Sequence, residues 1–260
     1  MSLKKHFASE VTEALKRYLK PGILTEQDIC HLPEVVQKYI RYAGCIGKEK
    51  TWNFRAVFEG EMKLDEKQDW IKIHSEQYNF FDSPSRFFHI TASMKGMPVT
   101  GLHVYKNATA TMQIKLAGMI TVADARGPKM DQGETVTVLN DMCLMAPASL
   151  ISPDISWEPI DDLSVRASFN NAGIRISARL AFNASGELAN FMSDDRFLSK
   201  DGKTYESLPW STPMGEYQEF DGRKVPASGE TTWHYPDHQY CYGKFWLKEI
   251  EFNIPELKLL

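Results

Sequence analysis

The sequence has no long apolar run, no cluster of basic residues and few cysteines. A membrane-spanning helix needs about 20 consecutive apolar residues, and neither such a run nor the apolar segment of a signal peptide occurs. Lysine and arginine are dispersed among acidic residues, and the net charge is -4. Because neutralising phosphates requires clustered basic side chains, we expect no nucleic-acid partner.

The cysteines do not form a recognisable framework. Cys30, Cys45, Cys143 and Cys241 are widely spaced, and none of them belongs to a Cys-x-x-Cys pair. Cys143 and Cys241 lie in apolar surroundings, where a cysteine usually acts as a small hydrophobic residue. We therefore interpret the cysteines as reduced core residues.

Motifs of the familiar catalytic classes are also missing. There is no G-x-S-x-G elbow, no glycine-rich phosphate loop and no H-E-x-x-H segment. His234 and His238 have the spacing of two zinc ligands on one helical face, but Pro236 between them favours a surface turn. We predict no metal site and no cofactor, whereas an enzyme outside these classes is not excluded.

What the chain does have is the composition of an ordinary globular protein. Of its 260 residues, 43% are hydrophobic, 25% are charged and 12% are aromatic. A chain of this length can bury a large core without disulfides or metals. We expect one domain that spans residues 1–260.

Residues 1–45 are predicted to be helical. The first apolar stripe at helical spacing consists of Phe7, Val11, Ala14, Leu15 and Tyr18. Pro21 ends this run. A second helix is expected to begin at Pro33 and to end at Gly44, a residue suited to a left-handed cap.

From Trp52 onward the apolar period changes to two, which is typical of strands. Residues 51–252 contain roughly ten or eleven such strands, separated by hairpin turns and without β-α-β alternation. Arg55, Glu59 and Glu61 alternate with the first apolar set, so we interpret their side as a solvated face. Near the end of the chain, Phe245 and Leu247 fall on odd positions of the apolar alternation, whereas Ile250 and Phe252 fall on even positions. This change of parity predicts a bulge.

One helix interrupts the strands at about residues 131–145. Asp131 and Glu134 have the spacing of a capping box, and Pro147 ends the helix. An apolar stripe on one face consists of Val136, Leu139, Met142 and Cys143. The fold class that follows is α+β, mainly antiparallel β. We expect a large curved sheet forming a half barrel or barrel, with the helical segments plugging its concave side.

A few polar and aromatic residues stand out as candidate ligand contacts. His74 and Glu76 share one strand face and could serve as a general base or as metal ligands, although we favour an exposed polar face that also carries Lys72. If the sheet encloses a cavity, its walls and orienting groups would include Glu76, Arg126, Arg196, Trp210, Tyr217, Glu230 and Trp233. The alternative is a filled aromatic core with charges at its rim.

Several segments resemble an uncharacterised bacterial family of unknown function over residues 30 to 252. The matching segments are Leu32–Gly44, Val122–Gly127, Gly133–Glu134, Trp157–Asp162, Pro209–Trp210 and Gly229–Trp233. The resemblance supplies no catalytic residues. Where that family tends to have Trp-Phe-Pro, this chain has Met145-Ala146-Pro147. Many members carry an N-terminal hydrophobic segment that this sequence does not show. The pattern also resembles, remotely, the half barrels of lipoprotein carriers, whose concave face holds acyl chains.

Three functions are consistent with these features. The first is non-catalytic binding of a hydrophobic or amphipathic, lipid-like small molecule in the concavity of the sheet. The second is a hydrolase or isomerase that uses Glu76 or Glu230 as general base with Arg126 or Arg196 as anion partner. The third is an envelope-associated structural module that docks through its first helix. The expected location is cytoplasmic, or the envelope, with peripheral membrane association, if a native N-terminal segment was removed.

Overall fold

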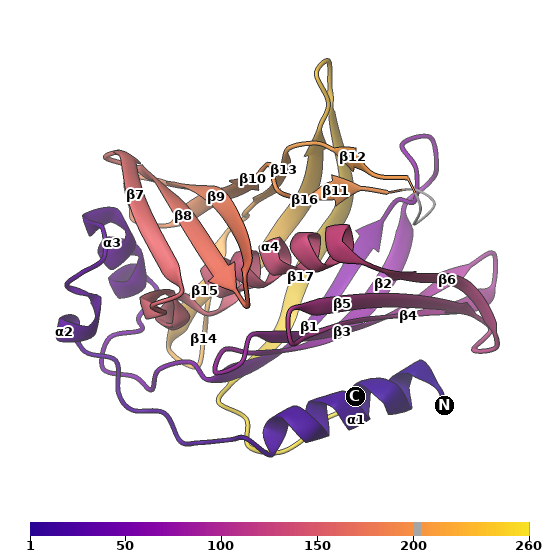
Figure 1. Ribbon diagram of the computed structural model, residues 1–260, viewed down its shortest axis with the longest axis horizontal. Coiled ribbons are helices and arrows are strands. Elements are labelled where there is room, and N and C mark those ends of the chain that lie inside the picture. Colours follow the sequence, from indigo (N-terminus) through magenta and orange to yellow (C-terminus); the bar gives the residue numbers. More distant parts are fainter. Residues whose placement is uncertain (200–203, 260) are drawn as a thin grey trace.

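A thirteen-stranded antiparallel sheet forms most of the computed structural model, which describes residues 1–199 and 204–259. The strand order is β6-β5-β4-β3-β2-β1-β17-β16-β13-β10-β9-β8-β7, so β6 and β7 are the two free edges. The sheet curves around the long helix α4 without closing (Figure 1). The predicted class, α+β with a half barrel of antiparallel strands, is confirmed.

The elements have the following bounds. The helices are α1 (Leu3–Leu15), α2 (Glu26–Ile29), α3 (Glu34–Tyr42), α4 (Pro128–Met145) and the short 3-10 helix η1 (Pro147–Ile151). One half of the main sheet contains β1 (Asn53–Met62), β2 (Ile71–Phe80), β3 (Ser85–Met94), β4 (Met97–Lys106), β5 (Thr109–Leu116) and β6 (Ile120–Arg126). The other half contains β7 (Ile155–Asp161), β8 (Ser164–Asn171), β9 (Ile174–Phe182), β10 (Leu188–Ser193), β13 (Trp210–Pro213), β16 (Ser228–His234) and β17 (Gln239–Phe252). Separate hairpins pair β11 (Phe197–Leu198) with β12 (Glu206–Ser207), and β14 (Tyr217–Phe220) with β15 (Arg223–Pro226).

The two halves of the sheet meet where its first and last strands pair. β1 and β17 run antiparallel, with Phe54 opposite Phe252 at one end and Met62 opposite Gly243 at the other. Val57 faces Glu249 whereas Phe58 faces Leu247, so Lys248 is the extra residue of a bulge. The predicted bulge is confirmed. It keeps the apolar side chains before and after it on the same face of the sheet.

Helix α4 fills the concave side of the sheet between its two halves. It contacts β5 and β6 on one side and β9 and β10 on the other. The predicted stripe of Val136, Leu139, Met142 and Cys143 lies in the core. Burial extends beyond it, because every residue from Gly133 to Met145 is buried. A helix surrounded by a curved sheet buries its whole circumference, and its polar side chains then need partners inside the protein.

The start of α4 also differs from the prediction. The helix begins at Pro128, with Gly127 as N-cap at a φ of 121°, and no side chain of the described residues caps it. Asp131 does not belong to a capping box, because its carboxylate accepts the Ala110 backbone N–H at 2.7 Å. This bond ties the first turn of α4 to β5. The tertiary contact therefore replaces the local bond that the spacing suggested.

Helix α1 lies on the outer, convex face of the sheet rather than in its concavity (Figure 1). Phe7 and Val11 are fully buried and Leu15 is 7% exposed, in a cluster with Tyr78 and Phe80 of β2. The expectation that all helical segments plug the concave side is therefore wrong for α1. Burial of this stripe inside the domain also counts against the third function, because the stripe is not available for docking.

Arg55 corrects another expectation about the outer face. Its side chain is 3% exposed and lies 2.7 Å from Glu76, with Glu249 at 2.9 Å. The sequence pattern predicts a solvated position. In the folded protein the neighbouring strands supply acidic partners that satisfy the buried guanidinium.

Candidate functional site

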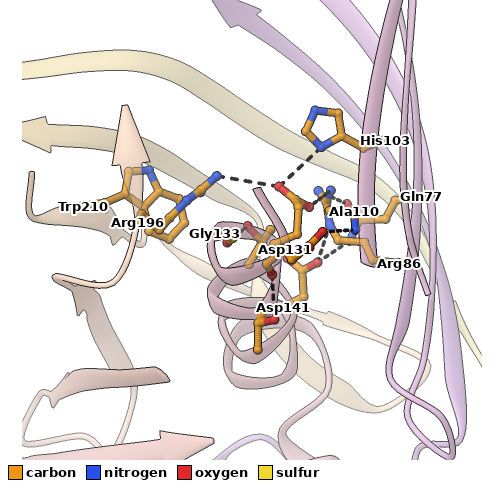
Figure 2. Close-up of polar contacts among 12 residues, drawn as sticks. Gln77, Arg86, His103, Ala110, Asp131, Gly133, Asp141, Arg196 and Trp210 are labelled. Atoms are coloured by element: carbon orange, nitrogen blue, oxygen red, sulfur yellow. Dashed lines mark hydrogen bonds and ion pairs between the residues drawn. The ribbon is translucent and has the colours of Figure 1, made fainter. Parts of the chain in front are cut away.

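A cluster of buried charges lies between α4 and the strands of the first half of the sheet (Figure 2). At its centre is Glu134 of α4, which is 5% exposed. Its carboxylate lies 3.4 Å from Arg86 Nη1, 3.4 Å from His103 Nδ1 and 3.8 Å from Arg196 Nη2. Three basic groups from different parts of the chain thus surround one acidic side chain.

Asp141 is the second acidic member of this cluster. It follows Glu134 by seven residues, about two helical turns, so the two side chains share one face of α4. The Asp141 carboxylate accepts hydrogen bonds from Gln77 Nε2 at 2.7 Å, Arg86 Nε at 2.8 Å and Asn79 Nδ2 at 3.0 Å. Arg86 therefore bridges the two carboxylates.

The register of the sheet explains why these groups meet. Gln77 and Asn79 are two residues apart on β2 and point to the same face. Arg86 of β3 stands opposite Asn79, and His103 of β4 stands opposite Phe88. These alternating positions all face α4, so a polar patch on three adjacent strands meets the acidic face of the helix.

The surroundings shift the pKa values of Glu134 and Asp141 in opposite directions. Burial favours the neutral form of Glu134, but His103, Arg86 and Arg196 outweigh it and hold the pKa well below its usual value. Burial raises the pKa of Asp141 above its usual value, although Arg86 and Asn79 oppose this shift. The charge on Glu134 contributes to the raised pKa of Asp141.

Arg196 is the member of the cluster with the weakest attachment. Its guanidinium stacks on Trp210 at 4.2 Å from the ring centre and lies 5.9 Å from that of Trp233. Its Nε is buried and has no hydrogen-bond partner within the described part of the chain. Gly133 leaves space beside it, because a Cβ at that position would be 4.0 Å from this nitrogen. The guanidinium is therefore well oriented, while its capacity to bind an anion is only partly used.

Burial of the concave face falls along the strands with distance from α4. Under the helix, Tyr105 of β4 and Ala110 of β5 are fully buried. Further along, the apolar side chains are only half-buried. The half-buried apolar side chains are those of four residues, which we call the open stretch: Phe88, Ile90, Met112 and Ile114. In Figure 1, β3 to β6 continue past the first turn of α4 in this direction.

The open stretch borders the charge cluster directly. Phe88 and Met112 both stand opposite His103 in the sheet, and the Arg86 guanidinium lies 4.6 Å from the Phe88 ring centre. Ser75, opposite Ile90 on β2, is 1% exposed, and its hydroxyl has no hydrogen-bond partner among the described residues. An apolar surface, an unsatisfied hydroxyl and basic groups thus lie next to one another.

Of the residues expected from the sequence to line a cavity, three lie beside one another: Arg196, Trp210 and Trp233. Tyr217 lies elsewhere on the concave side, where its hydroxyl donates to the Leu188 carbonyl at 3.0 Å. The structure leaves the remaining predicted residues apart. Glu76 binds Arg55 on the outer face, Glu230 lies 3.9 Å from Lys244, and Arg126 binds Asp124 on the edge strand.

These positions separate the carboxylates from the arginines with which the enzyme hypothesis paired them. His74 is exposed on the outer face, whereas its neighbour Glu76 is buried. His234 and His238 also have different partners, Ser211 for the former and Asp237 and Glu66 for the latter. Within residues 1–199 and 204–259, no group of three or more His, Cys, Asp or Glu side chains is arranged to hold a metal ion.

Sequence reasoning missed the centre of the site, namely Glu134, Asp141, Arg86, His103 and Gln77. One signal could have indicated part of it. Glu134 and Asp141 are acidic residues at two-turn spacing inside a helical segment that carries no other charge from residue 133 to residue 145. Their basic partners on the strands occupy ordinary alternating positions and carry no local signal.

This chain is similar to solved structures at low sequence identity. Among solved structures it is similar to an outer membrane lipoprotein-sorting protein domain from Vibrio parahaemolyticus, with 11% identity, a TM-score of 0.43 and coverage of 84% of this chain and 91% of that chain. It is also similar to a LolA superfamily protein from Nitrosomonas europaea, with 7% identity, a TM-score of 0.41 and coverage of 84% and 93%. We draw no function from likenesses at this distance.

Comparison with curated proteins gives no match. Across the described residues, no helix is both long and apolar enough to cross a membrane. The model of a family of unknown function, DUF6544, matches residues 22–245. Because this match covers most of the chain, the protein belongs to the DUF6544 family.

Proposed function

We propose that the protein is a non-catalytic binding protein for an amphipathic, lipid-like small molecule. The ligand's apolar chain would lie on the open stretch, and its polar end would lie toward Arg196 and His103. The observation that carries the proposal is the half-buried apolar surface of Phe88, Ile90, Met112 and Ile114, which adjoins a buried cluster of charges. Apolar walls with a few convergent polar groups are the common composition of ligand sites.

The position proposed for the ligand differs from the one expected from the sequence. The centre of the concavity is not hollow, because α4 occupies it with side chains buried on every side. We therefore place the ligand beyond the first turn of α4, where the strand residues are less buried. A chain bound there would cover apolar side chains that water now partly contacts.

The polar end of the ligand is proposed to be anionic. Arg196 has one carboxylate partner among the described residues, at the long distance of 3.8 Å, and a buried Nε without a partner. An incoming carboxylate or phosphate would gain charge-assisted hydrogen bonds to this guanidinium. Trp210 already orients the guanidinium by stacking, so little ordering is needed on binding.

The test uses native mass spectrometry with two probes of equal chain length, oleate and oleyl alcohol. We expect retention of oleate by the unmodified chain and weaker retention of the alcohol. Ile114→Glu should lower oleate retention by about tenfold or more, because it places a charge in the apolar contact. The matched control is Ile120→Glu, at a position that is 59% exposed, and it should retain oleate normally.

Arg196→Gln separates the contribution of the charge from that of the apolar surface. It should weaken retention of oleate while leaving retention of oleyl alcohol nearly unchanged. Circular dichroism of each variant checks that the fold is intact. The proposal fails if neither probe is retained by the unmodified chain, or if Ile114→Glu and Ile120→Glu behave alike.

A further inference from the structure

Two hollows of about 250 and 320 Å³ lie along β16 and β17, away from the charge cluster. They share two lining residues, Ser228 and Trp246, which stand opposite each other on the paired strands. The neighbours of Trp246, Phe245 and Leu247, pack against the core on the concave side. Because side chains alternate along a strand, Ser228 and Trp246 point to the outer face.

Trp246 is unusual among the tryptophans in its exposure. Its side chain is 40% exposed, and it takes part in none of the ring contacts between described residues. An indole that lines a hollow and is open to solvent presents an apolar, electron-rich face. Such a face is available for stacking with a ligand.

The polar groups around this indole are largely uncommitted. Glu216, Gln218 and Ser228 line the hollows, and their side chains make no hydrogen bond to any residue in the described ranges. Glu230 has two contacts, because its carboxylate lies 3.9 Å from Lys244 Nζ and also interacts with the Cys241 thiol. The site thus offers several hydrogen-bond donors and acceptors that folding itself does not use.

The balance of charges points to the class of ligand. Glu216 and Glu230 are matched in number by Lys244 and Lys248 among the lining residues. Lys248 is itself paired with Glu59 at 3.4 Å, so the lining has no excess of positive charge to attract an anion. A charged ligand would meet a repelling side chain for each attracting one. The polar lining also disfavours a purely apolar ligand, because its groups would lose water without gaining partners. A neutral molecule with many hydroxyl groups and an apolar ring face satisfies both conditions.

We infer that this outer hollow binds a neutral saccharide, with a sugar ring stacked on Trp246. The polarised C–H groups of one ring face contact the negative face of the indole. The hydroxyl groups at the ring's edge exchange hydrogen bonds with Ser228, Gln218 and the two glutamates. The volumes of the hollows are small for ligand sites, which suits one sugar ring or a short oligosaccharide.

The test probes the full chain on an array of neutral oligosaccharides built from glucose, galactose, mannose and N-acetylglucosamine, with sialylated and sulfated counterparts. The strongest neutral ligand is then titrated by calorimetry. Trp246→Ala should weaken its binding by about tenfold, while Trp246→Phe keeps most of it because a stacking ring remains. Ile160→Ala, at another exposed apolar position on β7, is the control and should bind normally.

Several outcomes would overturn the inference. Binding of charged saccharides alone would exclude a neutral ligand, and unchanged binding by Trp246→Ala would exclude the indole. Adsorption to phosphatidylcholine vesicles that depends on Trp246, without binding of any saccharide, would assign the surface to membranes instead. The inference does not depend on the proposed lipid site, because Trp246→Ala should retain oleate like the unmodified chain.

Discussion

Arg86 shows at the scale of one residue how this fold tolerates charges in its interior. Its guanidinium donates to Asp141 at 2.8 Å and approaches Glu134 at 3.4 Å, and all three side chains are buried. Placing such charges out of water is costly unless each one finds partners. The mutual attraction within the cluster therefore stabilises the fold by less than the removal of one member would destabilise it.

Replacement of Arg86 should accordingly destabilise the protein strongly. Arg86→Met leaves the carboxylates of Glu134 and Asp141 with fewer partners, and we expect a loss of about 3–5 kcal/mol in the free energy of unfolding. Urea denaturation followed by circular dichroism measures this change. The matched control is Arg166→Met. The Arg166 side chain is 56% exposed, and its ion pair with the exposed Glu158, at 3.6 Å, lies at the surface. The control should change stability by less than about 0.5 kcal/mol, and equal losses in both variants would contradict the prediction.

The candidate site could be predicted from the sequence only in part, also for reasons at this scale. The sequence analysis groups Arg196 with Trp210 and Trp233, because these residues are expected in neighbouring strands and two of them are aromatic. The three side chains do lie together. Glu76 seemed equally suited to a cavity. It points to the opposite face, where Arg55 neutralises it. The register of the sheet decides which face Glu76 occupies, and therefore which partners its carboxylate has.

Helix α4 is the element that decides how the concave side is used. It fills the space between the two halves of the sheet and leaves only the far part of β3 to β5 less covered. Its end at Pro147 followed from local chemistry, as predicted. Its beginning did not, because Asp131 bonds to Ala110 of β5 rather than to its own helix.

Gly133 gives a prediction that belongs to this element. A glycine inside a helix lowers stability by roughly 0.5–1 kcal/mol relative to alanine, and a Cβ here would meet only Arg196 Nε, at 4.0 Å. Gly133→Ala should therefore raise the free energy of unfolding by about that amount. Gly127→Ala is the contrasting control, because its φ of 121° is unfavourable for alanine, and it should destabilise. Thermal unfolding measures both, and a lower melting temperature for Gly133→Ala would contradict the prediction.

Considered as a whole, the molecule is joined at the centre of its sheet. β1 and β17 lie far apart in sequence and connect the two halves, while α4 packs against both. Neither half can bury its concave face alone. We therefore propose that residues 1–260 form one domain, as the sequence led us to expect.

One cooperative unfolding transition should follow from this arrangement. Loss of the β1–β17 pairing or of α4 exposes the cores of both halves at once, so no stable half-molecule is expected. The midpoints of urea unfolding monitored by far-ultraviolet circular dichroism and by tryptophan fluorescence should coincide. Two separate midpoints would indicate that the halves unfold independently.

The sequence by itself determined the antiparallel class, the long strands with their hairpin turns, and the C-terminal bulge, although it predicted roughly ten or eleven strands and the main sheet has thirteen. These features depend on local backbone preferences and on the alternation of apolar side chains, which neighbouring residues display directly. Only the tertiary structure decided that α1 covers the outer face, that α4 fills the concavity and that Arg86 joins Glu134 to Asp141. Those outcomes depend on register and packing between segments far apart in the chain, and no local pattern encodes them.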